Sequence, residues 1–425
     1  MKFPTAENSP EAVLNSAVVA LNVLRRNDCS LDDFLDQYSG NKLLRKRLAN
    51  LLFACFRNRC ATARALEMCC RKAPEVEVQD FLTAALTMAA FQDSMSPESV
   101  VNIAVTVAKK QFNAAVGRFV NAVLRKALIL IKTVKVDPLP PEIRCEWQKN
   151  FPPETVQHLA ELFTGRPGNT VRLRSGFAVP ESDQMILDPL PLDLPWRFYN
   201  CSQLGELLQS AEFADGKYYI QDPAPAHVCA LLQKFHTLLP RNLTVLDLCA
   251  APGGKLIMNV ELLNTLQHRL QRCVAVDRSV RRLDLVRENC LRCKISSETV
   301  AGDGADPAIF AGQTFELVTC DVPCSNSGVF RHRPDALWRW RRSDLPEITA
   351  LQHKILCNAV RLTAVNGLLI YSTCSLEEAE NSQQIRLLLQ TYPQMELLEE
   401  KLFMPQTYCD GTYVAILRKN SGGGQ

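Results

Sequence analysis

Apolar positions in the first third of the chain recur with the period of an α-helix. Residues 9–11 combine a capping serine, a proline suited to the first helical position and an acidic side chain, and an apolar face follows. Residues 96–98 repeat this start signal before a second apolar face. Because such runs continue to about Ile131 with little glycine or strand-like alternation, the pattern predicts an all-α bundle over residues 1–135.

The helical pattern stops at the prolines of residues 137–141, since proline cannot continue a helix. The segment that follows, residues 142–235, combines a helical stretch with strand-like runs near residues 171–174 and 217–221. The sequence therefore predicts a small α+β segment between the bundle and the rest of the chain.

From about Arg241 onward, short buried-strand runs alternate with helical patterns. This alternation predicts a doubly wound, Rossmann-like α/β domain over residues 236–420. In such a domain, ligands bind beyond the carboxyl ends of the parallel strands. The residues at or just after the ends of the five predicted strands are therefore candidates for chemistry: Asp247, Asp277, Asp303, Asp321 and Cys374.

Composition narrows the class of protein. The chain has 425 residues, 47% hydrophobic and 22% charged, as expected for a globular protein of two or three domains. A secretion signal and a long apolar stretch are both lacking, so we expect a cytoplasmic protein without membrane contact. We also expect the protein to be monomeric. The 17 cysteines are expected to be mostly reduced thiols. Cys290 and Cys293 have metal-ligand spacing, but no second pair accompanies them, so we expect no zinc site.

Charge is distributed unevenly along the chain. The formal net charge is +3, whereas residues 1–135 contain 19 Lys and Arg against 12 Asp and Glu, a difference of +7. No acidic residue lies between Glu98 and Asp137, where seven cations occur. This asymmetry favours a polyanionic partner, although the solvated face of an ordinary amphipathic helix accounts for it equally well.

The turn after the first predicted strand is rich in small residues, which let backbone N–H groups approach a ligand at a helix N-terminus. Asp277, after the next strand, can accept hydrogen bonds from both hydroxyls of a ribose. Together these features indicate a nucleoside-containing cofactor, whereas the turn alone would fit an ordinary tight turn. The phosphate-loop and nicotinamide-binding patterns both fail here. The candidate cofactor residues of the turn are Cys249, Ala250, Ala251, Pro252, Gly253, Gly254 and Lys255.

Three motifs in this order resemble the signature of the S-adenosylmethionine-dependent RNA cytosine-5 methyltransferases: residues 247–255, residues 321–325 (Asp-Val-Pro-Cys-Ser) and residues 372–375 (Ser-Thr-Cys-Ser). Within that superfamily, the chain is most similar to the bacterial 16S rRNA family called RsmB, Sun or Fmu. Residues 117–125 are similar to a run in that family's NusB-like domain, residues 219–222 to its pre-catalytic motif, and residues 325–338 to its segment after the Pro-Cys. Residues 376–381 and 410–411 match weaker positions of the family. Val322, where relatives have Ala, and Ser175, where they commonly have Asn, depart from the family pattern.

The resemblance implies a class I methyltransferase domain preceded by an all-α NusB-like domain. It also implies S-adenosyl-L-methionine as the cofactor, with Asp277, Asp303 and Asp321 among the binding residues. The expected substrate is 16S ribosomal RNA or an assembling small ribosomal subunit. Alternatives are a transferase acting on tRNA or another rRNA site, a non-catalytic RNA-binding factor with a vestigial transferase half, and a small-molecule methyltransferase.

The chemistry of cytosine agrees with this resemblance. Carbon 5 becomes nucleophilic only after a thiolate adds to carbon 6, so a catalytic cysteine is required. By resemblance to the RNA enzymes, Cys374 is the nucleophile and Cys324 assists product release. In the DNA enzymes the Pro-Cys cysteine attacks instead, which leaves the reverse assignment open. Asp321 is expected to hydrogen-bond the cytosine ring and stabilise the negative charge that the attack creates.

Other residues allow two interpretations. Asp303, in Ala-Gly-Asp-Gly, matches a position that contacts the adenine side of the cofactor, but Asp-Gly is also a common turn. Lys255 is expected to contact either the substrate or the cofactor carboxylate. A cluster between residues 331 and 342 either holds RNA or forms a solvated helix with buried tryptophans. Its members are Arg331, Arg333, Arg339, Arg341 and Arg342 with Trp338 and Trp340.

Overall fold

The computed structural model describes residues 9–27, 29–38 and 41–421. Within these ranges the chain forms two compact units. The helical unit contains the described residues up to Arg166 together with Phe330–Trp340, and the catalytic unit contains Pro167–Val329 and the described residues from Arg341 onward. Among the described residues, no helix has the length and apolar character needed to cross a bilayer.

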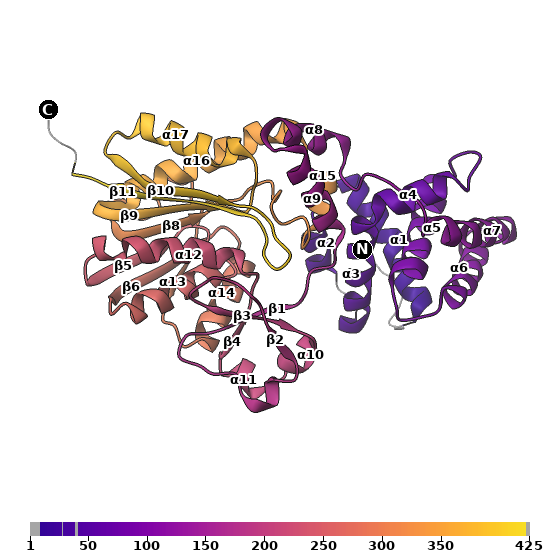
Figure 1. Cartoon of the computed structure of the whole chain (residues 1–425), viewed down its shortest axis with the longest axis horizontal. Coiled ribbons are helices and arrows are strands. Elements are labelled where there is room, and N and C mark those ends of the chain that lie inside the picture. The colour runs from indigo at the N-terminus through magenta and orange to yellow at the C-terminus, as the bar shows by residue number, and fades with distance from the viewer. Residues whose placement is uncertain (1–8, 28, 39–40, 422–425) are drawn as a thin grey trace. The chain divides into compact units, whose positions relative to one another are not determined.

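In the helical unit, α1, α3, α5, α6 and α7 contribute most of the residues of one apolar core. Figure 1 shows these helices. The predicted helix starts are confirmed, because Ser9 precedes α1 and the Ser96 side chain accepts a hydrogen bond from Ser99 N at the start of α6. The helices of this unit are α1 Pro10–Asn27, α2 Leu31–Gln37, α3 Lys42–Arg57, α4 Arg59–Glu67, α5 Val76–Phe91, α6 Pro97–Gln111, α7 Ala114–Leu130, α8 Pro141–Asn150, α9 Pro153–Thr164 and α15 Pro334–Arg339.

The helical unit extends beyond the predicted boundary at residues 137–141. Trp147 of α8 is fully buried and stacks on Phe330, with ring centroids 6.0 Å apart, and Phe163 of α9 packs on the same ring at 5.5 Å. These aromatic contacts keep α8 and α9 with the bundle. The helical unit therefore continues to Arg166. The three predicted domains, residues 1–135, 142–235 and 236–420, stay a prediction about which parts fold independently.

A small antiparallel sheet opens the catalytic unit, with the strand order β2-β3-β1-β4. Two of its strands, β1 and β4, coincide with the predicted strand-like runs. Its elements are β1 Thr170–Leu173, η1 Glu181–Asp183, β2 Leu187–Pro189, β3 Arg197–Cys201, α10 Leu204–Leu207, α11 Ala211–Ala214 and β4 Tyr218–Ile220.

The main sheet of the catalytic unit has seven strands in the order β10-β11-β9-β8-β5-β6-β7. The strands from β9 to β7 run parallel, whereas β11 pairs antiparallel with β9 and with β10. All five predicted strands are confirmed, and the hairpin β10–β11 is additional. The strands are β5 Asn242–Asp247, β6 Arg269–Asp277, β7 Glu298–Ala301, β8 Phe315–Asp321, β9 Thr363–Thr373, β10 Met395–Phe403 and β11 Thr412–Lys419.

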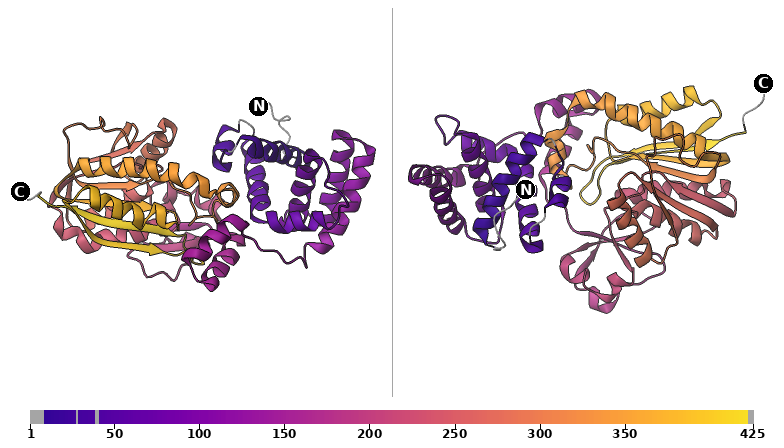
Figure 2. Two further views of the ribbon diagram at one scale, coloured as in Figure 1. Left: turned by 90° about the horizontal axis from the view of Figure 1, so that it is seen from above. Right: turned by 180° about the vertical axis from the view of Figure 1, so that it is seen from behind.

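Helices cover both faces of this sheet (Figures 1 and 2). Successive strand residues point to opposite faces, so Val245 belongs to the core beneath α12, α13 and α14, and Leu246 to the core beneath α16 and α17. This two-layer cover is the doubly wound α/β architecture predicted from the sequence. The remaining elements are α12 Ala224–Phe235, η2 His236–Leu238, α13 Gly254–Thr265, α14 Val280–Arg292, η3 Arg342–Asp344, α16 Leu345–Leu362, η4 Glu378–Glu380 and α17 Ser382–Thr391.

Candidate active site

The carboxyl ends of the parallel strands lie at one edge of the main sheet, and most predicted site residues follow them there. Asp247 ends β5, Asp277 ends β6 and Asp321 ends β8. In the register of the sheet, Asp321 lies opposite Ser372 of β9, two residues before Cys374. The sheet therefore brings the predicted acids and the predicted nucleophile to the same edge.

The two cysteines of the motifs are in contact. Their Sγ atoms lie 3.1 Å apart, and each side chain is partly buried. The Cys374 thiol also lies 3.3 Å from Asn326 Oδ1, which can accept its proton in a hydrogen bond. The hydrogen bond with Cys374, together with burial, raises the pKa of Cys324 well above its usual value. Cys324 therefore keeps its proton, next to the other sulfur.

Asp321 is held by two neighbours. Its Oδ1 accepts a hydrogen bond of 2.8 Å from Ser372 Oγ, and its Oδ2 lies 2.5 Å from Lys255 Nζ at the start of α13. Burial acts to lower the pKa of Lys255, but the Asp321 carboxylate outweighs burial, so the pKa is raised. Lys255 thus remains a cation, and the ion pair fixes the direction of the Asp321 carboxylate.

Asp247, behind this ion pair, is nearly inaccessible at 2% exposure. Burial and, to a lesser extent, the charge of Asp321 raise the pKa of Asp247 to about 7. Its Oδ1 accepts a hydrogen bond of 3.3 Å from Cys249 N, which tethers the small-residue turn to the end of β5.

The small-residue turn leads directly into α13. Ala250 N donates to Val276 O of β6 at 2.9 Å, so the turn also packs against the end of the second strand. Gly253 has φ of +102°, in the left-handed region that favours glycine, and no side chain caps the helix that it precedes. The N-terminus of α13 thus has no side-chain cap, and the prediction that this loop holds a cofactor stays a prediction.

Asp277 is buried at 6% exposure, and the Arg282 guanidinium lies 3.5 Å from its Oδ2. Its Oδ1 accepts a hydrogen bond of 2.9 Å from Ser279 N. The Arg282 guanidinium also donates to Ala251 O at 2.8 Å. Arg282, which the sequence reading did not single out, thus links the carboxylate predicted for a ribose to the turn.

Asp303 lies two residues beyond β7, and its Oδ1 accepts a hydrogen bond of 2.9 Å from Ala305 N. This contact agrees with the turn interpretation of Asp303. The loop after β7 also lies close to the residue that follows β5, because a Cβ on Gly304 would lie 3.1 Å from Leu248 O.

Two residues without a predicted role contact the cysteine loops. Asn326, in the left-handed region with φ of +60°, joins the loops by bonding Cys374 Sγ and, at 3.0 Å, Cys324 O. Glu380 is fully buried and accepts hydrogen bonds from both loops. Their sequence signal was membership of segments that resemble the family, residues 325–338 for Asn326 and the weaker match at residues 376–381 for Glu380.

The arginine and tryptophan cluster is divided between the units. Phe330–Trp340 packs in the helical unit, where Trp338 Nε1 donates to Phe56 O at 2.8 Å and the Arg59 guanidinium lies 4.6 Å from the Trp338 ring. Trp340 and Arg331 are buried, at 6% and 5% exposure. These contacts favour the interpretation as packed tryptophans for this part of the cluster.

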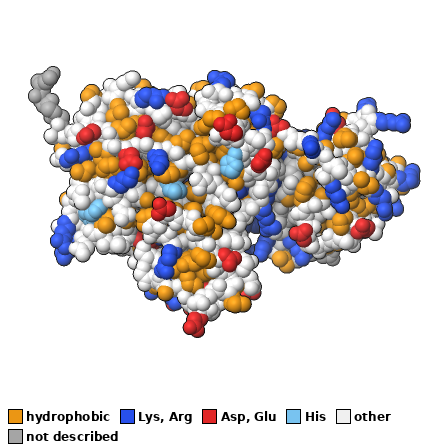
Figure 3. Space-filling model, in the orientation of Figure 1, with side chains coloured by type: hydrophobic (Ala, Val, Ile, Leu, Met, Phe, Trp, Pro, Cys, Tyr) orange, Lys and Arg blue, Asp and Glu red, His pale blue; other side chains and the backbone are white. Residues whose placement is uncertain are grey.

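The basic segment of the helical unit lies on α6, on α7 and just beyond α7, and Figure 3 shows Lys and Arg side chains over this end of the unit. All seven of its cations are exposed: Lys109, Lys110, Arg118, Arg125, Lys126, Lys132 and Lys135.

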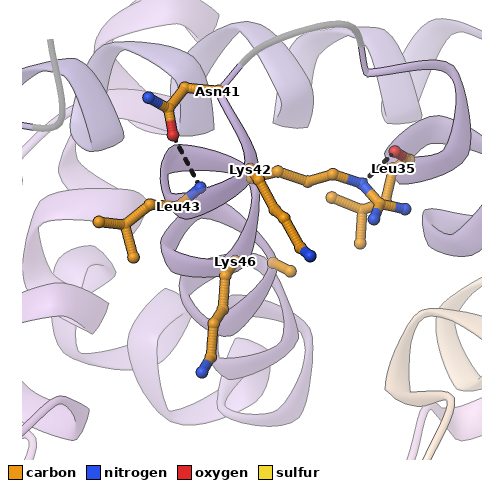
Figure 4. A pocket seen from close by; sticks show the side chains of 7 residues that line it. Leu35, Asn41, Lys42, Leu43 and Lys46 are labelled. Carbon is orange, nitrogen blue, oxygen red and sulfur yellow. Dashed lines mark hydrogen bonds between the residues drawn. The ribbon is translucent and has the colours of Figure 1, made fainter. Parts of the chain in front are cut away.

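A separate hollow lies at the start of α3 (Figure 4). It contains none of the predicted site residues. Its lining consists of Leu35, Asn41, Lys42, Leu43, Arg45, Lys46 and Ala49.

Comparison with known proteins agrees with the two-part architecture. Residues 236–418 match the family described as 16S rRNA methyltransferase RsmB/F, and residues 10–128 match the NusB family. The predicted combination of a NusB-like helical region with a Rossmann-like methyltransferase domain is therefore confirmed.

Relatives of this chain include two proteins named ribosomal RNA small subunit methyltransferase B. The one from Sodalis glossinidius is 39% identical over 189 residues, which is 44% of this chain and 41% of the relative. The one from Escherichia coli K12 is also 39% identical over 189 residues, 44% of this chain and 42% of that protein. The match thus spans less than half the length of either relative.

Among solved structures, PH0851 superimposes on this chain with a TM-score of 0.70 at 19% identity, covering 98% of this chain and 100% of that one. NSun6 from Pyrococcus horikoshii, solved with SFG, gives a TM-score of 0.56 at 18% identity over 68% of this chain and 100% of the other. At these identities the likeness concerns the fold.

Proposed function

We propose that this protein transfers a methyl group from S-adenosyl-L-methionine to carbon 5 of a cytosine in 16S ribosomal RNA, through a covalent adduct with a cysteine. The observation that carries the proposal is the contact of Cys324 with Cys374, 3.1 Å apart, beyond the strand ends where Asp321 also lies. Two thiols and a carboxylate at the ends of neighbouring parallel strands match the needs of addition to a pyrimidine followed by elimination.

The residues around the small-residue turn fit a nucleoside-containing cofactor. The α13 N-terminus lacks a side-chain cap, and Asp277 presents a buried carboxylate at the next strand end. Residues 249–255 and Asp277 would hold S-adenosyl-L-methionine, with Asp303 and Asp321 beside it. When bound, this cofactor supplies an electrophilic methyl group.

Cys374 is the proposed nucleophile. Its sulfur adds to carbon 6 of the cytosine, which makes carbon 5 nucleophilic toward the methyl group. After transfer, a base accepts the proton from carbon 5, the electron pair of that bond re-forms the double bond between carbon 5 and carbon 6, and the Cys374 sulfur leaves carbon 6 as a thiolate. Cys324, whose pKa is raised by the hydrogen bond with Cys374 and by burial, holds a proton 3.1 Å from the departing sulfur and assists its release.

Asp321 and Lys255 act together on the ring in this proposal. The Asp321 carboxylate accepts a hydrogen bond from the exocyclic amine and so orients the base. The Lys255 ammonium, 2.5 Å from Asp321 Oδ2, places a positive charge where the addition pushes electrons into the ring. This assigns Lys255 to the substrate side rather than to the cofactor carboxylate.

The exposed cations of α6 and α7 are proposed to contact RNA phosphates. Such contacts release counterions, so binding should weaken as salt rises. The target cytosine must be unpaired or flipped out, because carbon 6 is inaccessible inside a stacked helix.

The test is a gel assay for a denaturation-resistant protein–RNA adduct with 16S rRNA and labelled S-adenosyl-L-methionine. Cys324→Ala should accumulate the adduct, whereas Cys374→Ala should form none and transfer no methyl group. Cys145→Ala, which changes an exposed cysteine of the helical unit, is the control and should behave as wild type.

The opposite pattern, full activity in Cys374→Ala and none in Cys324→Ala, would overturn the assignment of the nucleophile. Methyl transfer to tRNA but not to 16S rRNA would select the related transferase, and transfer without any RNA would select a small-molecule enzyme. RNA binding with no methyl transfer would identify a non-catalytic factor.

A further inference from the structure

Glu380 is a carboxylate buried at the centre of the candidate active site. It ends the short helix η4 and has 0% exposure. Its Oε1 accepts hydrogen bonds from Ser325 Oγ at 2.5 Å and Ser375 Oγ at 2.6 Å. Its Oε2 accepts from Ser325 N and from Gln352 Nε2, each at 2.9 Å. These four donors offset the cost of burying a carboxylate.

The donors belong to the loops that carry the two cysteines. Ser325 follows Cys324 at the end of β8, and Ser375 follows Cys374 at the end of β9. Both serine hydroxyls bond the same oxygen of Glu380. One side chain therefore ties together two loops that are 50 residues apart in the sequence.

Further bonds hold the loops against each other. Gln352 Nε2 on α16 donates to Pro323 O at 2.9 Å as well as to Glu380, so the residue before Cys324 is fixed by the same group. Gly328 N donates to Cys374 O at 2.9 Å, and a Cβ on this glycine would lie 2.8 Å from that oxygen. The loops are thus packed without room for a side chain at that crossing.

We propose that Glu380 is a positioning residue that sets the distance and direction between the sulfurs of Cys324 and Cys374. This inference rests on the proposed function for its catalytic consequence, although the sulfur geometry can be tested without RNA. One thiol adds to the cytosine and the other assists its release, so both sulfurs must be correctly placed against the same base. Displacing a catalytic group by about 1 Å can lower the rate about 100-fold.

A purely structural role is the alternative explanation for a buried glutamate. Glu380 O accepts a hydrogen bond of 2.6 Å from the Tyr371 hydroxyl, and this backbone contact persists whatever side chain is present. The two explanations differ in their effect on a folded variant. A positioning role alters the reactivity of the sulfur pair at constant stability of the domain, and a structural role alters stability alone.

The first measurement is the rate at which diamide joins Cys324 to Cys374. Diamide takes up the two thiol hydrogens and is reduced to a hydrazine while the sulfurs form a disulfide, which peptide mass spectrometry identifies. The variants are Glu380→Gln, Glu380→Asp and the control Glu378→Gln. Glu378 lies two residues earlier but is exposed and pairs with Arg386 at 2.6 Å.

The second measurement is the single-turnover rate of methyl transfer to 16S rRNA, with the affinity for S-adenosyl-L-methionine measured alongside. We expect Glu380→Gln to slow disulfide formation about tenfold and methyl transfer about 100-fold, with cofactor affinity unchanged. Glu380→Asp keeps the charge on a shorter stem and should recover part of both rates. Glu378→Gln should match wild type.

Wild-type rates of disulfide formation and methyl transfer in a folded Glu380→Gln protein would overturn the proposal. Should that variant not fold, wild-type rates in Glu380→Asp would overturn it equally, because the shorter carboxylate cannot keep all four donors at their distances. A slower disulfide in Glu380→Gln, combined with no methyl transfer by wild type, would retain the positioning role and reject the proposed function.

Discussion

The buried charges between the small sheet and α13 offer a test of how the catalytic unit is held together. Glu261 of α13 pairs with Arg172, with Oε2 to Nη1 at 2.5 Å, and with Arg174 Nε. All three residues are buried, at 8%, 0% and 9% exposure. Arg174 also donates to the backbone oxygens of Gly216 at 2.8 Å and Cys293 at 2.9 Å.

Glu261→Gln keeps the size of the side chain and removes its charge. The buried guanidinium groups of Arg172 and Arg174 then lose the carboxylate that neutralises them. Removing one partner of a buried ion pair lowers the free energy of unfolding by about 3–5 kcal/mol. With a urea dependence of about 3 kcal/mol per molar for a domain of this size, the unfolding midpoint should fall by about 1–2 M. The control Glu212→Gln, at a half-exposed pair with Lys217 3.5 Å away, should cost less than about 1 kcal/mol.

Hydrogen exchange of β1 amides over a urea series would measure the effect, because these amides report opening of the sheet at the junction. An equal midpoint for Glu261→Gln and Glu212→Gln would refute the reasoning. The combined replacement Arg172→Met, Arg174→Met and Glu261→Leu should recover most of the loss. Within the described chain, Arg172 Nη2 has no hydrogen-bond partner, so the charged network is incompletely satisfied and apolar groups can replace it.

Two further outcomes follow from the strand ends. The pKa of the Asp247 carboxyl is raised from 3.8 to about 7, so the folded state binds a proton on Asp247 more tightly than the unfolded state does. Protonated Asp247 therefore contributes its full stability to the folded state below about pH 4, and this contribution is lost as the pH rises through 7. Asp247→Asn should therefore gain up to about 4 kcal/mol relative to wild type between pH 4 and 8 in thermal unfolding, and a pH-independent difference would contradict this. Asp277→Ala should weaken S-adenosyl-L-methionine binding about tenfold or more in calorimetry, whereas Asp284→Ala, at an exposed ion pair with Arg287, should not; equal affinities would remove Asp277 from the cofactor site.

Local sequence determined the elements that carry the candidate site. Residues 243–246 are Leu-Thr-Val-Leu between two polar residues, and the small residues of a turn follow Asp247, so this pattern favours a buried strand before a turn. The same holds for the strands before Asp277 and Asp321. Since parallel strands align their carboxyl ends, the meeting of these residues at one edge followed from the predicted sheet.

Other features depended on contacts that no local pattern encodes. Residues 395–403 contain mainly Leu, Glu and Lys, which favour helix, yet pairing with β11 makes them strand β10. The cluster at residues 331–342 allowed two interpretations, RNA contact or a solvated helix with buried tryptophans. The packing of Phe330–Trp340 in the helical unit favours buried tryptophans for that part. Only contacts between distant residues decided these outcomes.

The sequence by itself determined which chemical groups the strand ends present, because strand boundaries and turns depend on neighbouring residues. The tertiary structure alone decided how those groups meet. It places the two cysteine sulfurs 3.1 Å apart, pairs Lys255 with Asp321, and lets the buried Glu380 accept hydrogen bonds from both cysteine loops. The physical reason is that a hydrogen bond between residues 50 positions apart leaves no periodic trace in either segment.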